Sequence, residues 1–322
     1  MEGIVNVLKP PGMTSSDVVV WMRKVLKTKK IGHTGTLDPG VAGVLPLCVG
    51  KGTRLAEYIT EQGKAYLAEV TFGIMTDTQD AFGKEIQVTS TDLRQSDIER
   101  VLPSFRGEIA QIPPMYSAVR KEGKHLYEYA RQGIAVERTP REVSIYKLEL
   151  EKWYEGEFPR AILYIECSKG TYIRTLSHDL GQSLGCGAYM SNLLRVRSGP
   201  FNIQESWTLE EIEAAAAESN YLFLLPLTAG IDLPQVFLTA LRAKAFRHGL
   251  PTKRELVKNF PLEGDSQFVD RGSCFEMTSS VRTLNLEPQT SSKSYVQVIE
   301  AGELIGIGVW REDSLFPHKV FG

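Results

Sequence analysis

Apolar and polar positions alternate along several segments of the chain. These segments are residues 66–72, 143–150 and 161–167, and they include several β-branched and aromatic side chains. A two-residue period of this kind is typical of β-strands that bury one face. A short apolar segment, residues 4–8, ends at the turn sequence Pro10-Pro11-Gly12. The pattern therefore predicts a sheet with one buried face.

Other segments have a helical period. The first follows possible N-caps at Ser15, Ser16 and Asp17, and its apolar positions are Val18, Trp21, Met22 and Val25. The second opens with Thr208-Leu209-Glu210-Glu211, a capping-box sequence before an alanine run. Helices and antiparallel-looking strands are mixed without regular βαβ alternation. The predicted fold class is α+β, with a mixed, largely antiparallel sheet.

A second unit is expected from residue 233 to residue 322, after a first domain of residues 1–232. It begins with a helical pattern that ends at His248-Gly249, where glycine suits a C-terminal cap. Two strand-like runs, residues 295–299 and 304–310, flank a tight turn and predict a hairpin. A length of 322 residues fits two domains of about 100–200 residues each.

Composition excludes several classes of protein. Hydrophobic residues make up 42% and charged residues 24% of the chain, which rules out a disordered or collagen-like chain. No apolar run approaches the ~20 residues that span a bilayer, and the N-terminus lacks the pattern of a signal peptide. The four cysteines are scattered, which argues against a disulfide scaffold or a structural zinc site. We expect a cytoplasmic protein with no membrane partner.

Charge is unevenly distributed although the formal net charge is only -2. Between residues 20 and 54 the chain carries seven Lys or Arg residues and a single acid, Asp38, whereas residues 198–241 hold acids and no Lys or Arg. A basic surface would attract a phosphate backbone. The alternative is a solvated face whose counter-charges come from elsewhere in the fold, and charge alone does not decide between them.

The segment Gly32-His33-Thr34-Gly35-Thr36-Leu37-Asp38-Pro39-Gly40, called here the glycine-rich segment, contains the candidate chemistry. Its glycines allow the backbone to approach a ligand closely. Nearby cations are expected to depress the pKa of Asp38 and keep it ionised. An ionised carboxylate there could stabilise or trap an oxocarbenium-like sugar centre. It could equally cap a turn, and the spacing alone does not identify a reaction.

Several ordered motifs resemble those of the bacterial tRNA pseudouridine synthase B family over about residues 3–230. Besides the glycine-rich segment, these are Lys9-Pro10-Pro11-Gly12-Met13-Thr14-Ser15, Lys64-Ala65-Tyr66, Thr76-Asp77-Thr78 to Asp80 and Gly83, Pro113-Pro114-Met115-Tyr116-Ser117-Ala118, and Ser168-Lys169-Gly170-Thr171-Tyr172-Ile173-Arg174. The C-terminal part resembles the family's small PUA-like RNA-binding domain more loosely. Gly40-Val41-Ala42-Gly43 departs from the Leu-Ala-Thr-Gly of many members, and Leu194-Arg195-Val196 from Leu-Arg-Arg.

The resemblance implies an isomerase that converts uridine to pseudouridine at position 55 in the T-arm of tRNA. Asp38 is then the catalytic aspartate, Tyr66 stacks on a flipped-out target base, and Arg174 pairs with Asp38 and orients it. Uracil leaves the sugar through its nitrogen and returns through its C5 carbon. Because no atoms are gained or lost, no redox cofactor or ATP is expected. The implied architecture is a pseudouridine synthase catalytic domain followed by a β-rich PUA-like domain.

The same resemblance suggests residues that hold the RNA. They are His33, Lys64, Tyr172, Leu194, Lys9, Arg120 and Lys124, with residues 113–146 as an insertion that clamps the RNA. His33 helps to extrude the target base in the family. A metal role for it is rejected, because no second His or Cys lies at ligand spacing. The family has a leucine against the target base at this motif, and Leu193 or Leu194 can be aligned with it. Alternation along a strand would put Tyr172 on the same face as Arg174.

Two rival functions remain at this point. One is the catalytic subunit of a guide-RNA ribonucleoprotein that modifies ribosomal RNA, which the insertion and the lack of lysine-rich tails disfavour. The other is an RNA chaperone without activity, which the presence of Asp38, Tyr66 and Arg174 disfavours. The expected partner is the T-arm stem-loop of tRNA. We expect a monomer that needs no protein partner.

Overall fold

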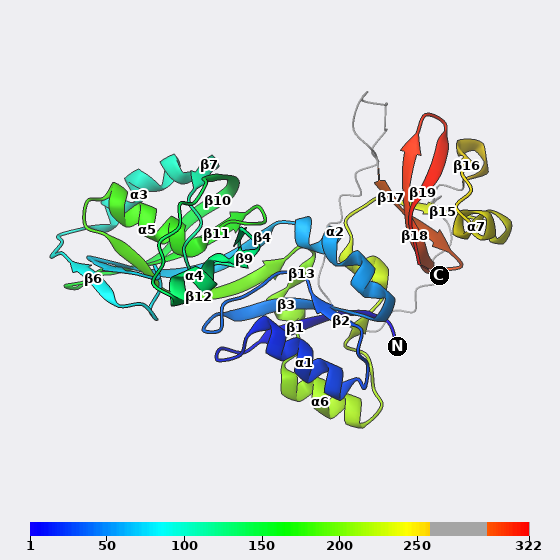
Figure 1. Cartoon of the computed structure of the whole chain (residues 1–322), viewed down its shortest axis with the longest axis horizontal. Helices are drawn as coiled ribbons and strands as arrows, with labels where there is room; N and C mark the ends of the chain where they lie inside the picture. The colour runs from blue at the N-terminus through cyan, green and yellow to red at the C-terminus, as the bar shows by residue number, and fades with distance from the viewer. Residues whose placement is uncertain (258–294, 322) are drawn as a thin grey trace. The chain divides into compact units, whose positions relative to one another are not determined.

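The computed structural model describes residues 1–257 and 295–321, which form two compact units, Met1–Ile231 and Asp232–Gly322 (Figure 1). The division lies one residue before the boundary expected from the sequence. Cys48, Cys167 and Cys186 are buried and free, and Cys274 lies outside the described residues. Within these described ranges, no helix has the length and apolar character needed to cross a membrane.

The first unit is built on a ten-stranded sheet whose main path is β14-β1-β3-β12-β4-β11-β10-β7. Its strands are β1 (Gly3–Lys9), β2 (Ile31–His33), β3 (Ala42–Val49), β4 (Lys64–Phe72), β7 (Gly107–Gln111), β10 (Arg141–Tyr154), β11 (Arg160–Cys167), β12 (Ala188–Ser198), β13 (Phe201–Asn202) and β14 (Leu224–Leu225). Only β3 and β12 pair in parallel. The predicted α+β class and largely antiparallel sheet are confirmed.

Helices α1 (Ser15–Val25) and α6 (Leu209–Ala217) cover the β1–β3 part of this sheet (Figure 1). Val18 and Met22 of α1 and Ile212 of α6 are fully buried in the main core. The capping box predicted at Thr208 is confirmed, because its hydroxyl accepts a hydrogen bond from the Glu211 amide. The N-cap of α1 is Thr14 rather than one of the three residues after it.

Further helices and short strands complete this unit. They are η1 (Gly50–Leu55), α2 (Ala56–Glu61), β5 (Ile74–Thr76), β6 (Glu85–Val88), α3 (Gln95–Val101), η2 (Leu102–Phe105), α5 (Ile173–Ser183), η3 (Ile203–Glu205) and η4 (Leu227–Gly230). At the parallel join of β3 and β12, Gly43 has a φ of +124°, and a Cβ there would lie 2.2 Å from the Arg195 carbonyl oxygen. Only glycine lets the two strands approach this closely.

The predicted insertion, residues 113–146, consists of short elements followed by the start of a long strand. It contains β8 (Arg120–Lys121), β9 (Lys124–His125) and α4 (Leu126–Arg131). From Arg141 onward the chain is already β10, whose residues 141–145 pair with β7 of the central sheet. The last residues of the predicted insertion, 141–146, therefore belong to a strand of the central sheet.

The second unit is a small sheet of order β15-β17-β18-β19-β16 with one helix. Its elements are β15 (Gln235–Phe237), α7 (Ala240–Arg247), β16 (Thr252–Lys253), η5 (Arg254–Leu256), β17 (Tyr295–Glu300), β18 (Glu303–Arg311) and β19 (Ser314–Val320). The predicted hairpin is confirmed as the antiparallel pair β17 and β18. Phe246 of α7 is fully buried against the sheet residues Val298 and Ile305.

Candidate active site

The glycine-rich segment forms a loop between β2 and β3 that is anchored around Asp38. Thr34 is fully buried, and its hydroxyl donates to the Pro46 carbonyl oxygen at 3.2 Å. The Leu37 amide donates to the Ser15 hydroxyl at 2.9 Å, which ties the loop to the first turn of α1. The Asp38 side chain remains 42% exposed. The loop thus presents a carboxylate to solvent from a fixed backbone.

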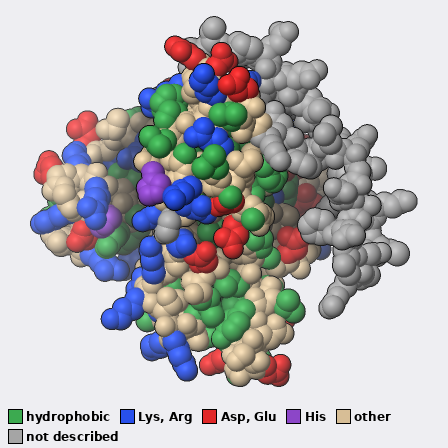
Figure 2. All heavy atoms as spheres, turned by 90° about the vertical axis from the view of Figure 1, so that its right-hand side faces the viewer, with side chains coloured by type: hydrophobic (Ala, Val, Ile, Leu, Met, Phe, Trp, Pro, Cys, Tyr) green, Lys and Arg blue, Asp and Glu red, His purple; other side chains and the backbone are tan. Residues whose placement is uncertain are grey.

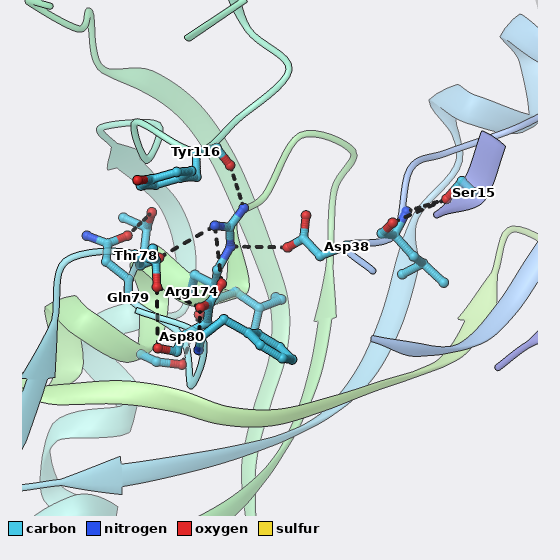
Figure 3. Close-up of polar contacts among 12 residues, drawn as sticks. Ser15, Asp38, Thr78, Gln79, Asp80, Tyr116 and Arg174 are labelled. Atoms are coloured by element: carbon cyan, nitrogen blue, oxygen red, sulfur yellow. Dashed lines mark hydrogen bonds and ion pairs between the residues drawn. The ribbon is translucent and has the colours of Figure 1, made fainter. Parts of the chain in front are cut away.

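Arg174 lies beside Asp38 and binds a second carboxylate as well (Figure 3). Its Nε is 3.2 Å from Asp38 Oδ2, and its Nη1 is 3.4 Å from Asp80 Oδ2. Its Nη2 donates to the Tyr116 carbonyl oxygen at 2.9 Å. The side chain is only 7% exposed. The structure therefore brings together the predicted pair Asp38 and Arg174, and different nitrogens of the one guanidinium face Asp38 and Asp80.

Asp80 belongs to this cluster, although the sequence assigned it no role. Its Oδ1 accepts hydrogen bonds from the Thr78 hydroxyl at 2.6 Å and from the Phe82 amide at 3.0 Å, while Oδ2 faces Arg174. The side chain is 12% exposed, so these partners replace the water that burial removes. Asp77 lies in the same turn, and the sequence contained no signal that distinguishes the two acids.

The predicted lowering of the Asp38 pKa is wrong. Burial among protein atoms raises the pKa of Asp38, and the charge of Asp80 raises it further, while Arg174 and Lys9 oppose the change. Neither of these cations belongs to the basic stretch between residues 20 and 54. The cations that lower the pKa of Asp38 in the fold are therefore not the lysines and arginines that lie near it in the sequence.

Tyr66 and Arg195 form a second buried pair. They lie opposite each other on β4 and β12, and the Tyr66 hydroxyl is hydrogen-bonded to the Arg195 guanidinium. Burial raises the pKa of the Tyr66 hydroxyl above its usual range, so the group stays protonated and neutral. The hydroxyl is held by a fixed cation.

Arg195 also donates hydrogen bonds to the loop that carries Asp38, a role that the sequence did not reveal. Its Nη2 donates to the Gly35 carbonyl oxygen at 3.1 Å and its Nε to that of Val44 at 2.7 Å. The residue is only 1% exposed. Arginines are seldom fully buried without partners, and here the partners come from the glycine-rich segment, the next strand and Tyr66. The sole signal in the sequence was the motif at Leu194-Arg195-Val196.

Lys9 and Lys64 lie inside the protein rather than on a phosphate-binding surface. Lys9 Nζ donates to the Pro10 and Pro39 carbonyl oxygens at 2.8 and 3.2 Å. Lys64 Nζ binds the carbonyl oxygens of residues 60 and 62. Burial lowers the pKa of each lysine to about 8. Both side chains fix backbone near the site, and Lys9 holds the residue that follows Asp38.

His33 and the β12 leucines border the same region. The Gly35 amide donates to His33 Nδ1 at 3.4 Å, and burial lowers the pKa of the ring, so the imidazole is neutral near pH 7. In the pairing of β12 with β4, Leu193 lies opposite Ala68 and Arg195 lies opposite Tyr66. Because every second residue of a strand points to the same face, Leu193 lies on the face that bears Tyr66. Leu194 lies on the other face. The register thus separates the two leucines onto opposite faces of the sheet.

Alternation predicted that Tyr172 and Arg174 share one face of a strand. In the structure neither residue lies on a strand. Tyr172 is the N-cap of α5, and Arg174 is the second residue of that helix. The Tyr172 amide donates to Gln111 Oε1 at 2.9 Å, and its carbonyl oxygen accepts from Gln111 Nε2 at 3.3 Å. Strand β11 ends at Cys167, so the two-residue period does not extend to these residues.

Arg120 and Lys124 are exposed on the β8–β9 hairpin of the insertion. Lys124 Nζ lies 5.9 Å from the centre of the Tyr129 ring, and Arg131 lies over the Tyr127 ring at 5.3 Å. The basic and aromatic residues of this segment therefore contact one another. On the face drawn in Figure 2, Lys and Arg side chains occur in separate groups among acidic and apolar ones. Across residues 1–257 and 295–321, no cluster of three His, Cys, Asp or Glu side chains could hold a metal ion.

Comparison with known proteins identifies the family. A family model described as TruB family pseudouridylate synthase (N terminal domain) matches residues 23–173, and one described as tRNA pseudouridylate synthase B C-terminal domain matches residues 174–230. The chain is 52% identical over 252 residues to the tRNA pseudouridine synthase B of Symbiobacterium thermophilum, which covers 78% of this chain and 83% of that one. Identity to the Pelotomaculum thermopropionicum enzyme of the same name is 47% over 270 residues, 82% of this chain and 85% of the relative.

The fold matches a solved structure along nearly the whole chain. A chain in the crystal structure of a Cbf5–Nop10–Gar1 complex has a TM-score of 0.72 and 26% identity, and the match covers 99% of this chain and 85% of that chain. The fold is thus of the pseudouridine synthase class, with a PUA-like second unit. The chain belongs to the TruB family of pseudouridylate synthases, which are isomerases.

Replacement of Arg195 is expected to destabilise the protein. Arg195→Met leaves the Tyr66 hydroxyl and several loop carbonyl oxygens without their donor, which should lower the free energy of unfolding by at least about 3 kcal/mol. Arg197→Met is the matched control on the same strand, since its partly exposed ion pair with Glu166 should contribute about 1 kcal/mol or less. Urea unfolding measures both. Equal losses in the two variants would contradict the role of Arg195.

Proposed function

We propose that this chain isomerises the uridine at position 55 in the T-arm of tRNA, with Asp38 as the catalytic group and a flipped-out target base. The observation that supports it most is the exposed Asp38 carboxylate held by the buried Arg174 guanidinium. The printed name of the relatives, tRNA pseudouridine synthase B, supports tRNA as the substrate. Only a base that has left the helical stack would reach a carboxylate fixed in this loop.

The reaction requires one bond to be exchanged for another on the same sugar. The N1–C1′ bond breaks, uracil turns within the site, and a C5–C1′ bond forms. The C5 proton is then lost while N1 regains one, so the atoms balance without a cofactor. Asp38 can attack C1′ and form an ester, or it can assist a glycal route. Both routes require the ionised carboxylate, and Arg174 stabilises that form.

Tyr66 supplies the base-stacking surface in this proposal. Its ring lies on the sheet face that also bears Leu193, and Arg195 fixes its hydroxyl. Stacking on an aromatic ring stabilises an unstacked base by ~1–3 kcal/mol. Base and sugar would thus be held while the glycosidic bond is open. His33, neutral and half-buried beside the loop, would help to keep the base out of the RNA stack.

The remaining groups would hold the RNA. Arg120 and Lys124 are exposed and available for phosphates, and the PUA-like unit would add contacts. Leu193 or Leu194 would contact the base, and the backbone of Tyr172 would join the site to Gln111 at the end of β7. We propose a cytoplasmic monomer that acts on bare tRNA. The chain is 52% identical to a relative named tRNA pseudouridine synthase B and 26% identical to the matched chain of the Cbf5–Nop10–Gar1 complex. The higher identity favours a tRNA enzyme over the subunit of a guide-RNA complex.

The first test is position-resolved mapping of pseudouridine in an unmodified tRNA transcript. Wild-type protein alone should modify uridine 55, and a transcript with cytidine at that position should stay unmodified. Asp38→Asn should slow the reaction at least roughly 10⁴-fold, as loss of a nucleophile does in other enzymes. RNA binding should persist, because a negative charge near phosphate is removed. Turnover by Asp38→Asn at the wild-type rate would exclude the catalytic role.

The pH dependence provides a second test. The rate should fall about tenfold per pH unit below the pKa of Asp38, because only the carboxylate reacts. Asp80 raises this pKa and Arg174 lowers it. The acid limb of the single-turnover rate at saturating RNA should therefore move to lower pH in Asp80→Asn and to higher pH in Arg174→Gln. Asp97→Asn is the control, because Asp97 is a partly exposed acid on α3 that pairs with Arg100. Shifts of the same sign in the first two variants would contradict the assignment.

A further inference from the structure

Phe82 is unusually exposed for its position in the fold. Its exposed fraction of 79% is the highest among the large hydrophobic residues in the part of the chain that the structure describes. It lies in the turn between β5 and β6, beside the Asp80 carboxylate that binds Arg174. An isolated apolar side chain on a surface is ordinary. An exposed ring that is fixed beside the Asp80 carboxylate, close to the proposed catalytic site, requires a different explanation.

The Phe82 ring lies against the catalytic loop. A Cβ at Gly40 would be 2.3 Å from both Cε2 and Cζ of Phe82. The ring therefore occupies the space that a side chain at position 40 would take. Gly40 follows Asp38 by two residues, which span at most about 7 Å. The exposed ring over Gly40 thus forms an aromatic surface beside the site.

The turn that carries Phe82 is held rigidly. The Phe82 amide donates to Asp80 Oδ1 at 3.0 Å, and the Lys84 amide donates to Asp77 Oδ1 at 2.8 Å. The same Asp80 carboxylate faces Arg174, which in turn pairs with Asp38. The ring is thus fixed relative to the catalytic carboxylate through two shared ion pairs. Its exposure is a feature of an ordered turn.

We propose that Phe82 is a stacking platform for the nucleobase next to the target uridine. This inference rests on the proposed function. When a base is flipped out, its neighbours in the RNA lose a stacking partner. An aromatic ring offers a replacement that tolerates any base. Phe82 lies where such a neighbour would be, because the target sugar must lie at Asp38 and the ring covers the backbone that follows it.

The test compares side chains that differ in their π-face while all cover Gly40. Phe82→Leu keeps an apolar side chain but cannot stack, and it should raise the Kd and KM for a T-arm stem-loop transcript by roughly 5- to 100-fold, with a smaller effect on kcat. Phe82→Tyr should bind like wild type. Ile86→Ala is the matched control, since Ile86 is 60% exposed on β6 of the same hairpin. Thermal melting verifies that each variant folds.

Abasic RNA separates stacking from packing. Stem-loops that lack the base immediately 5′ or immediately 3′ of the target are compared in a thermodynamic cycle with Phe82→Leu. The penalty of the substitution should vanish with one of the two RNAs. Equal binding by Phe82→Leu and wild type, equal losses in Phe82→Leu and Phe82→Tyr, or a penalty unchanged in both abasic RNAs would overturn the proposal. If wild-type protein converts no uridine, the proposed function fails, while the binding cycle still tests Phe82.

Discussion

The buried guanidinium of Arg174 is the interaction on which the site depends. Removing a charged group from water is costly, and a buried cation persists only when its donors are satisfied. The fold satisfies this one with two carboxylates, Asp38 and Asp80, and with carbonyl oxygens of Thr78 and Tyr116. These partners come from the glycine-rich segment, the β5–β6 turn and the start of the predicted insertion. A single side chain therefore fixes three segments relative to one another.

A second buried arginine organises the other half of the site. Arg195 contacts the glycine-rich segment, β3 and the Tyr66 hydroxyl. It connects these parts in the same way as Arg174 connects the two carboxylates. Lys9 and Lys64 extend the principle, since both bury an amino group against backbone carbonyl oxygens. Positive charge in this region thus holds backbone in place and biases Asp38 toward the ionised form. Preorganisation of this kind lets a carboxylate act without rearrangement during the reaction.

Local patterns predicted much of the fold because local physics decides them. Alternation placed β4, β10 and β11, and a capping box placed α6. The resemblance to a family then selected Asp38, Tyr66 and Arg174, two of which the structure joins in an ion pair.

Other features arise only from the tertiary structure. Burial of Arg195 and Lys9 contradicts the usual exposure of charged residues. Asp80 differs from Asp77 only in what lies beside it, and the pKa of Asp38 depends on burial that no sequence pattern reports. The measurement that most directly tests the central role of Arg174 is a double-mutant cycle on the single-turnover rate, with Arg174→Lys and Asp80→Asn. If Asp80 acts through Arg174, the combined loss should be clearly smaller than the product of the separate losses. Fully multiplicative losses would show that the two residues act independently and would contradict the account.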